Sequence, residues 1–181
     1  MNAAMLIDMP SDLFQWKTRQ GVDLTLRKVK PDDVPLFLWA SETFSNGTRY
    51  FRFGKTASLQ FTAQDIEPLC RPDHEWNAHY IVTREELGAE RFVANARYTL
   101  AKDRQSCEFA IVVMDQWHHH GIGKRLMEVL CDHAVKQGVP LIYGLVLPTN
   151  LAMQKFMKKC GFKLVPNPDD AIVLRFERWL V

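Results

Sequence analysis

Three consecutive β-like runs in the middle of the chain restrict the folds that it can adopt. They span His79–Arg84, Arg91–Leu100 and Ser106–Met114, and short polar turns separate them. Strands joined in this way pair as an antiparallel meander. The segment that follows alternates helix and strand, which is typical of a β-α-β crossover. The order therefore predicts an α+β sandwich built on one mixed sheet.

Helical and strand periodicities on both sides of the meander complete this prediction. Before it we expect, in order, a strand over Val22–Val29, a helix from Pro31 to about Phe44, a turn at Asn46-Gly47 and a helix over Thr62–Cys70. After it we expect a helix over Gly121–Gln137, a strand over Leu141–Leu147, a helix over Asn150–Cys160, and closing strands over Phe162–Val165 and Ala171–Trp179.

Composition limits the domain count and the classes of partner. The chain has 181 residues, of which 47% are hydrophobic and 24% are charged, with a net charge of +2. This predicts one globular domain over residues 22–181, preceded by a surface arm over residues 1–21. The balanced charge favours neither a nucleic-acid nor a membrane partner. We expect a cytoplasmic protein, because no secretory signal is recognisable and none of the four cysteines forms a C-x-x-C pair.

The segment Val113–Leu126, VMDQWHHHGIGKRL, carries the strongest functional signal. It follows an apolar strand and opens a helix. Such a turn presents unpaired backbone N–H groups and the positive end of the helix dipole, which together bind an anion such as phosphate. Gly121 and Gly123 are expected to let a ligand approach the backbone closely.

Two common nucleotide motifs do not fit this turn. A dinucleotide fingerprint requires G-x-G-x-x-G, but Leu126 stands where the third glycine belongs. A P-loop requires G-x-x-x-x-G-K-[ST], but His118 replaces its first glycine and Arg125 its hydroxyl residue.

The run Trp117–Gly123 instead resembles motif A of the GNAT superfamily of N-acyltransferases, although His118 replaces the usual Gln or Arg. Asn150 and the Gly161-Phe162 pair have the spacing of that superfamily, and Cys107–Val113 resembles its fourth strand. The resemblance covers residues 22–165. It implies a GNAT-type α/β/α sandwich with a mixed, mostly antiparallel sheet that splays between two central strands.

A narrower resemblance is to the acetyltransferase domain of bacterial Pat-type protein-lysine acetyltransferases. It rests on four segments: Gly21–Arg27, Thr48–Phe53, Glu108–Ala110 and Gly121–Glu128. It implies transfer of an acetyl group from acetyl-CoA to a primary amine, a lysine of a protein. Two alternatives stay open, namely a small amine as the acceptor and an inactive acyl-CoA sensor. Superfamily members are often homodimers.

The resemblance also implies which residues bind CoA. The pyrophosphate would lie on backbone N–H groups of the turn, and the pantetheine arm would pair with the edge of the preceding strand. The implied residues are Ile111, Val113, His118, His119, His120, Gly121, Ile122, Gly123, Lys124 and Asn150. Asn150 is equally consistent with a helix N-cap, and Lys124 with a solvated helix face. No metal site is expected, because three adjacent histidines in a tight turn cannot all reach one ion.

Glu108 is the candidate general base. A lysine amine has a pKa of about 10.4, so a base must remove its proton before it attacks a thioester. We expect Glu108 to be buried between Cys107 and Phe109, which would raise its pKa; the alternative is an exposed residue or an ion-pair partner. The resemblance further implies a strand bulge near Ile111–Val113, with the N–H of Val113 stabilising the thioester oxyanion.

The general acid and the acceptor site are less well specified. Met157 occupies the position at which many superfamily members carry an acidic tyrosine, so Tyr143, Tyr98, Cys160 or water could protonate the leaving thiolate. The segment Asn46–Lys55 is expected to be a loop that either covers the acceptor site or anchors its aromatic residues in the core.

Overall fold

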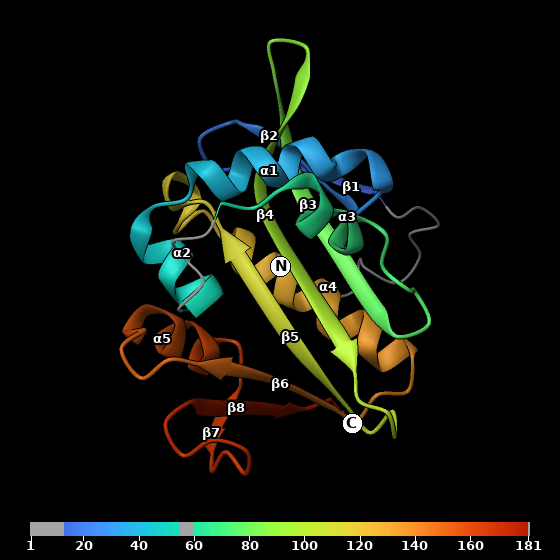
Figure 1. Cartoon of the computed structure of the whole chain (residues 1–181). Coiled ribbons are helices and arrows are strands. Elements are labelled where there is room, and N and C mark those ends of the chain that lie inside the picture. Colours follow the sequence, from blue (N-terminus) through green and yellow to red (C-terminus); the bar gives the residue numbers. More distant parts are fainter. Residues whose placement is uncertain (1–12, 55–59, 181) are drawn as a thin grey trace.

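The computed structural model describes residues 13–54 and 60–180 and contains an eight-stranded sheet (Figure 1). Its strand order is β1-β2-β3-β4-β5-β6-β8-β7, and only the β5–β6 pair is parallel. The strands are β1 (Leu13–Lys17), β2 (Asp23–Lys28), β3 (Asn77–Glu86), β4 (Ala89–Leu100), β5 (Ser106–Val113), β6 (Leu141–Val146), β7 (Lys163–Val165) and β8 (Leu174–Trp179).

Helices cover both faces of this sheet. They are α1 (Val34–Thr43), α2 (Asn46–Phe53), α3 (Ala63–Cys70), α4 (Ile122–Lys136) and α5 (Leu151–Lys159), with short 3-10 turns at Pro31–Asp33 and Asp115–Trp117. In Figure 1, α1 and α3 lie in front of the sheet and α4 lies behind it. The predicted mixed α/β/α sandwich is therefore confirmed. No helix among the described residues is long and apolar enough to cross a membrane.

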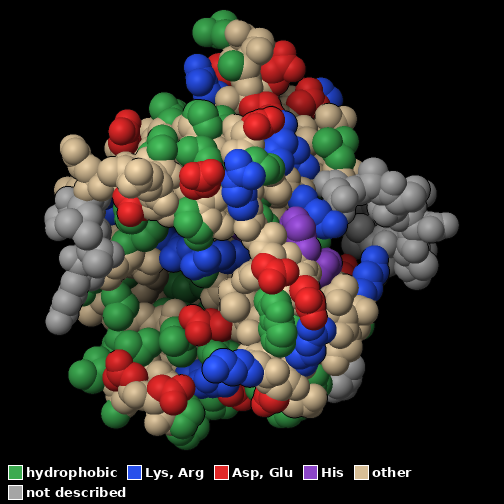
Figure 2. Space-filling view, turned by 45° about the vertical axis from the view of Figure 1, so that its right-hand side comes forward, with side chains coloured by type: hydrophobic (Ala, Val, Ile, Leu, Met, Phe, Trp, Pro, Cys, Tyr) green, Lys and Arg blue, Asp and Glu red, His purple; other side chains and the backbone are tan. Residues whose placement is uncertain are grey.

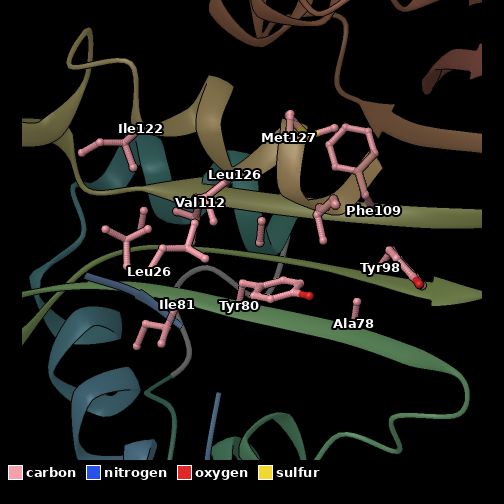
Figure 3. Packing of buried hydrophobic residues seen from close by; sticks show 14 of the residues in the cluster. Leu26, Ala78, Tyr80, Ile81, Tyr98, Phe109, Val112, Ile122, Leu126 and Met127 are labelled. Atoms are coloured by element: carbon pink, nitrogen blue, oxygen red, sulfur yellow. The ribbon is translucent and has the colours of Figure 1, made fainter. Parts of the chain in front are cut away.

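Helix α4 supplies the core on its face of the sheet. Its apolar stripe includes Ile122, Leu126 and Leu130, each at most 1% exposed, as the 3.6-residue period of the sequence predicts. Figure 3 shows the side chains of Ile122 and Leu126 beside residues that project from the strands, among them Tyr80 and Phe109. Burial of this stripe fixes the start of α4 relative to the end of β5.

The sheet splays between its two central strands, as expected. Strands β5 and β6 pair only where Ser106–Glu108 lies beside Leu141–Tyr143. Beyond that point the strands diverge, and Figure 1 shows β6, β8 and β7 running in a different direction from β3, β4 and β5. The ring of Phe109 lies against Gly144 at this point, since a Cβ on Gly144 would be 2.5 Å from Phe109 Cε1. Phe109 therefore acts as a wedge where the gap begins.

Two local predictions are wrong. The expected surface arm contains strand β1, because Phe14 and Trp16 are half-buried and alternate with exposed neighbours; residues 1–12 lie outside the described part. The expected turn at Asn46-Gly47 instead begins helix α2, because the Ser45 hydroxyl accepts the N–H of Thr48 at 3.2 Å as an N-cap. The Asn46–Lys55 segment is therefore helical as far as Phe53.

Candidate active site

The turn between β5 and α4 has the geometry of an anion site. His119 and Gly121 both adopt left-handed backbone angles, with φ of 64° and 79°. Helix α4 begins without a side-chain cap, and its first hydrogen bond runs from Arg125 N–H to Gly121 C=O. The N–H groups of the first helical turn therefore point out of the helix, where they can bind phosphate oxygens.

Histidine rings hold this turn in shape. The Nε2 atom of His118 lies 2.9 Å from the Val113 carbonyl, and the Nδ1 atom of His120 lies 2.8 Å from the His118 carbonyl. Because a carbonyl only accepts, each of these ring nitrogens donates. The rings thus bind the backbone of their own turn. Among the described residues, no group of three or more His, Cys, Asp or Glu is arranged to hold a metal ion.

The other predicted CoA contacts divide into backbone and side-chain positions. Ile122 is buried, so only its backbone faces the turn. A Cβ on Gly123 would be 3.3 Å from Phe156, which indicates that this glycine serves the close packing of α4 on α5. Lys124 is exposed and lies 3.8 Å from Glu128. Asn150 Oδ1 accepts the Met153 N–H at 3.0 Å, so the N-cap interpretation is confirmed.

The edge of β5 faces the gap. The Met114 N–H donates to Val93, and the Ala101 N–H donates to Ser106, both across the β4–β5 pair. Backbone polar groups alternate between the two sides of a strand. The N–H groups of odd-numbered Ile111 and Val113 therefore point away from β4, into the gap beside β6. This arrangement fits the pairing expected for a pantetheine arm.

The expected bulge near Ile111–Val113 is absent. Pairing of β4 with β5 runs without a shift from Leu100↔Cys107 to Ala94↔Val113. The register shift lies instead between β3 and β4, beside Val82. Because β5 is regular, Val113 lies five residues, or roughly 17 Å, from Glu108. Ile111 lies two residues closer to Glu108 along the same edge.

Glu108 is exposed, so the expected burial between Cys107 and Phe109 is wrong. Side chains alternate along a strand, so Glu108 projects from the face opposite to these two neighbours. It lies beside Tyr143 in the last β5–β6 pair before the gap. The Tyr143 hydroxyl donates to Glu108 Oε2 at 3.4 Å. Burial and the negative charge of Glu108 both raise the pKa of Tyr143.

The other candidate proton donors lie away from Glu108. The Tyr98 hydroxyl is 2.6 Å from His133 Nδ1 on the opposite face of the sheet. Met157 is fully buried. Burial raises the pKa of Cys107 to about 12 and that of Cys131 to about 11, and it also raises the pKa of Cys160. These thiols are poor nucleophiles and poor acids. The pKa of Tyr143 is also raised, and its hydroxyl is distinguished only by its contact with the Glu108 carboxylate.

Polar residues that sequence reasoning missed share the face of Glu108. The β3–β4–β5 register places Asn95, Arg97 and Thr99 on this face, next to His79 of β3. Arg52 of α2 interacts electrostatically with Arg97 and His79. The sequence signal was present, because polar residues alternate with apolar ones along RFVANARYTL. A polar face on a central strand is typical of a functional surface.

Helix α2 is tied to the anion site. The hydroxyls of Ser45 and Thr48 both donate to Asp115 Oδ1 at 2.9 Å. Although burial opposes ionisation, these hydrogen bonds lower the pKa of Asp115. Asp115 lies between β5 and the His118–Gly121 turn, so one carboxylate positions both the turn and the helix that carries Arg52.

Comparisons with known proteins identify the family. A family model described as an acetyltransferase (GNAT) domain matches residues 23–163. A Pseudomonas aeruginosa protein named as an acetyltransferase is 28% identical over 151 residues, which are 83% of this chain and 81% of that protein.

Solved structures agree in fold. The GNAT domain of S. lividans PAT superposes with a TM-score of 0.81 at 21% identity, over 95% of this chain and 99% of that chain. A cAMP-binding acyltransferase from Mycobacterium smegmatis gives a TM-score of 0.62 at 26% identity, over 93% of this chain and 47% of that chain. The chain therefore belongs to the GNAT acetyltransferase domain family, whose acyl donor is acetyl-CoA.

Proposed function

We propose that this acetyltransferase acts on lysine side chains of proteins, with Glu108 as the general base. The observation that carries the proposal is the position of Glu108. Its carboxylate is exposed on a polar sheet face at the point where β5 and β6 separate. An exposed base suits an acceptor lysine that is delivered on the surface of another protein. The resemblance of four sequence segments to Pat-type protein-lysine acetyltransferases supports the same acceptor class.

The proposed reaction is a direct transfer. Glu108 accepts a proton from the acceptor ammonium group, through water where the distance requires it. The amine nitrogen then attacks the thioester carbon, and the C–N bond forms as the C–S bond breaks. The thiolate of CoA takes up a proton from Tyr143 or from water, and the second proton that the attacking nitrogen releases restores this donor. The buried cysteines favour this route over an acyl-cysteine intermediate.

The strand edge and the helix terminus would bind the donor. First-turn N–H groups of α4 would hold the pyrophosphate, and the edge of β5 would pair with pantetheine. We assign the oxyanion contact to the N–H of Ile111 in place of Val113, because a regular β5 puts Ile111 nearer to Glu108. Ile111 and Val113 both direct their N–H groups into the gap.

The test is an acetylation assay read by mass spectrometry. Wild-type protein and Glu108→Gln are given acetyl-CoA with a lysine-rich protein mixture and a pool of small amines. We expect acetyl-lysine with the wild type and a loss of about 10²–10⁴-fold in rate with the variant. Unchanged affinity for acetyl-CoA would show that the variant has lost only the base.

Three outcomes would contradict parts of the proposal. Acetylated small amines without acetyl-lysine would move the acceptor class to metabolites. Full turnover by Glu108→Gln would remove Glu108 from the role of base. Binding of acetyl-CoA with no product on any amine would support the sensor alternative.

A further inference from the structure

Arg52 and Arg97 are two half-buried cations: Arg97 projects from the sheet face that carries Glu108, and Arg52 of α2 interacts with it electrostatically. The charge of each raises the local positive potential at the other, and burial together with the charge of Arg97 lowers the pKa of Arg52 to about 10. Burial also lowers the pKa of Arg97, while the charge of Glu108 opposes this shift. The described residues form nine ion pairs. None of these nine includes Arg52 or Arg97.

His79 adds no compensating charge to this pair. Its Nδ1 atom lies 2.8 Å from the Leu69 carbonyl and therefore donates, so its Nε2 atom accepts from the Asn95 amide at 2.8 Å. The ring is thus neutral. Burial and the charges of Arg97 and Arg52 lower the pKa of His79 to about 4, which keeps it neutral.

The surroundings leave room for a ligand. Arg97 and His79, but not Arg52, line a cavity of about 100 Å³ together with residues at the end of α3, including Arg71 and Asp73. The Asp73 carboxylate accepts the N–H of Glu75 at 3.0 Å. Figure 2 shows a hollow in the molecular surface, with basic side chains on its wall and acidic side chains at its lower rim.

Arg97 lies close to the candidate base. Arg97 is opposite Ala110 on β5, two residues from Glu108, and the three side chains project from one face. Diagonal neighbours of this kind are about 7–8 Å apart. An acceptor that presents an amine to Glu108 would therefore place its adjacent group near Arg97.

Resting on the proposed function, we propose that Arg52 and Arg97 bind a carboxylate of the acceptor, next to the amine that is acetylated. Half-buried cations of like sign are costly to keep together, and a bound carboxylate would relieve their repulsion. Guanidinium groups match the geometry of a carboxylate. In a protein acceptor, the carboxylate belongs to a glutamate or aspartate beside the lysine. In a small amine, it would be the acid group of the same molecule.

The test compares acceptors that differ only in this charge. Capped peptides carry one lysine flanked by glutamates or by glutamines, and Nα-acetyl-lysine is compared with its amide. We expect kcat/KM to favour the glutamate peptide by about tenfold or more, as charge-assisted hydrogen bonds imply. Arg97→Gln and Arg52→Gln should each bring this ratio close to one. Arg91→Gln is the matched control, because Arg91 is also on β4 but lies 3.4 Å from Glu86.

A second readout does not depend on turnover. Glutarate should raise the melting temperature of the wild type more than sodium chloride of equal ionic strength, and Arg97→Gln should abolish the difference. If Arg97→Gln does not fold, Arg52→Gln gives the same comparison. Equal rates on both peptides and both small amines, without a glutarate effect, would overturn the inference and leave the lysine proposal standing. A charge preference confined to the small amines would support the arginine site and contradict the protein acceptor.

Discussion

Two arginines on one face of the sheet have opposite environments. Arg27 on β2 binds Asp33 through two hydrogen bonds of 2.7 and 2.8 Å and also binds Glu90 at 2.8 Å. Burial alone would lower the pKa of Arg27, but these carboxylates raise it. Arg97, two strands away, interacts electrostatically with both Arg52 and Glu108 and has no ion pair among the described residues.

On our proposal, the difference separates a structural site from a binding site. The charge of Arg27 is compensated within the protein, so it holds β2 to the start of α1 and has nothing left to offer a ligand. The charges of Arg52 and Arg97 are left for a partner. A fold stabilises itself by satisfying buried charges, and an exception beside a candidate base indicates a functional constraint.

The largest expected effect comes from removing the buried carboxylate that binds Arg27. Asp33→Ala removes a carboxylate whose side chain is 1% exposed and leaves Arg27 with Glu90 alone. We expect the free energy of unfolding to fall by about 3–5 kcal/mol. Denaturant titration measures this change, with Arg97→Gln as the comparison, whose stability should change by less than about 1 kcal/mol. Equal losses in the two variants would contradict the distinction between the sites.

The second effect is a pH dependence of the free energy of unfolding, which comes from His79 beside Arg52 and Arg97. The pKa of His79 is about 4 in the folded protein, below its ordinary value of about 6.5. The unfolded chain therefore binds the proton first. This contribution to stability is complete above pH 6.5 and is lost as the pH falls toward 4, for a total of about 3 kcal/mol.

Denaturant titrations between pH 4 and 7 test this sign. His79→Gln should show a shallower loss of stability than the wild type over this range. Parallel curves for the two proteins would mean that His79 is not held neutral by burial and by the two arginines.

A smaller effect tests how Arg52 is positioned. Asp115→Ala removes the acceptor for the Ser45 and Thr48 hydroxyls. We expect a loss of about 1–2 kcal/mol in stability and a weaker preference for the glutamate peptide, because α2 carries Arg52. Asp115→Asn keeps one oxygen acceptor and should have a milder effect on both quantities. An unchanged peptide preference in Asp115→Ala would show that α2 is held by other contacts.

The smallest expected effect comes from the second carboxylate that binds Arg27, that of Glu90. The Glu90 side chain is 40% exposed, so solvent screens its pair with Arg27. Glu90→Gln should lower the free energy of unfolding by less than about 1 kcal/mol, well below the effect of Asp33→Ala. Thermal melts of the two variants side by side give the comparison. A loss as large as that of Asp33→Ala would show that the three charges act as one unit.

Local patterns predicted most of the elements. The apolar stripe of Ile122, Leu126 and Leu130 and the alternation in β2–β5 identified α4 and the meander, because periodicity reports which face is buried. Residues Asn46–Phe53 were missed because their helix depends on a Ser45 cap and on Asp115, which lies about seventy positions later in the chain. Strand β1 was missed because its five residues give too short a pattern.

The candidate active site was likewise predictable only in part. The glycine turn before α4 was recognisable because its residues are contiguous, and its backbone geometry follows from local sequence. The role of Glu108 as the base stays a prediction, and its expected burial is wrong because that expectation rests on Cys107 and Phe109 as its surroundings. In a strand, sequence neighbours point to opposite faces, so they say little about the environment of a side chain.

The sequence by itself determined the family, the order of the helices and strands from β2 onward except α2, and the glycine turn before α4, because each depends on contiguous residues. Only the tertiary structure decided that the gap opens at Phe109 and Gly144, that Tyr143 lies beside Glu108, and that Arg52 interacts electrostatically with Arg97. These features depend on strand register and on helix packing between distant segments. Register is set by the whole buried surface, and no single stretch of the chain contains it.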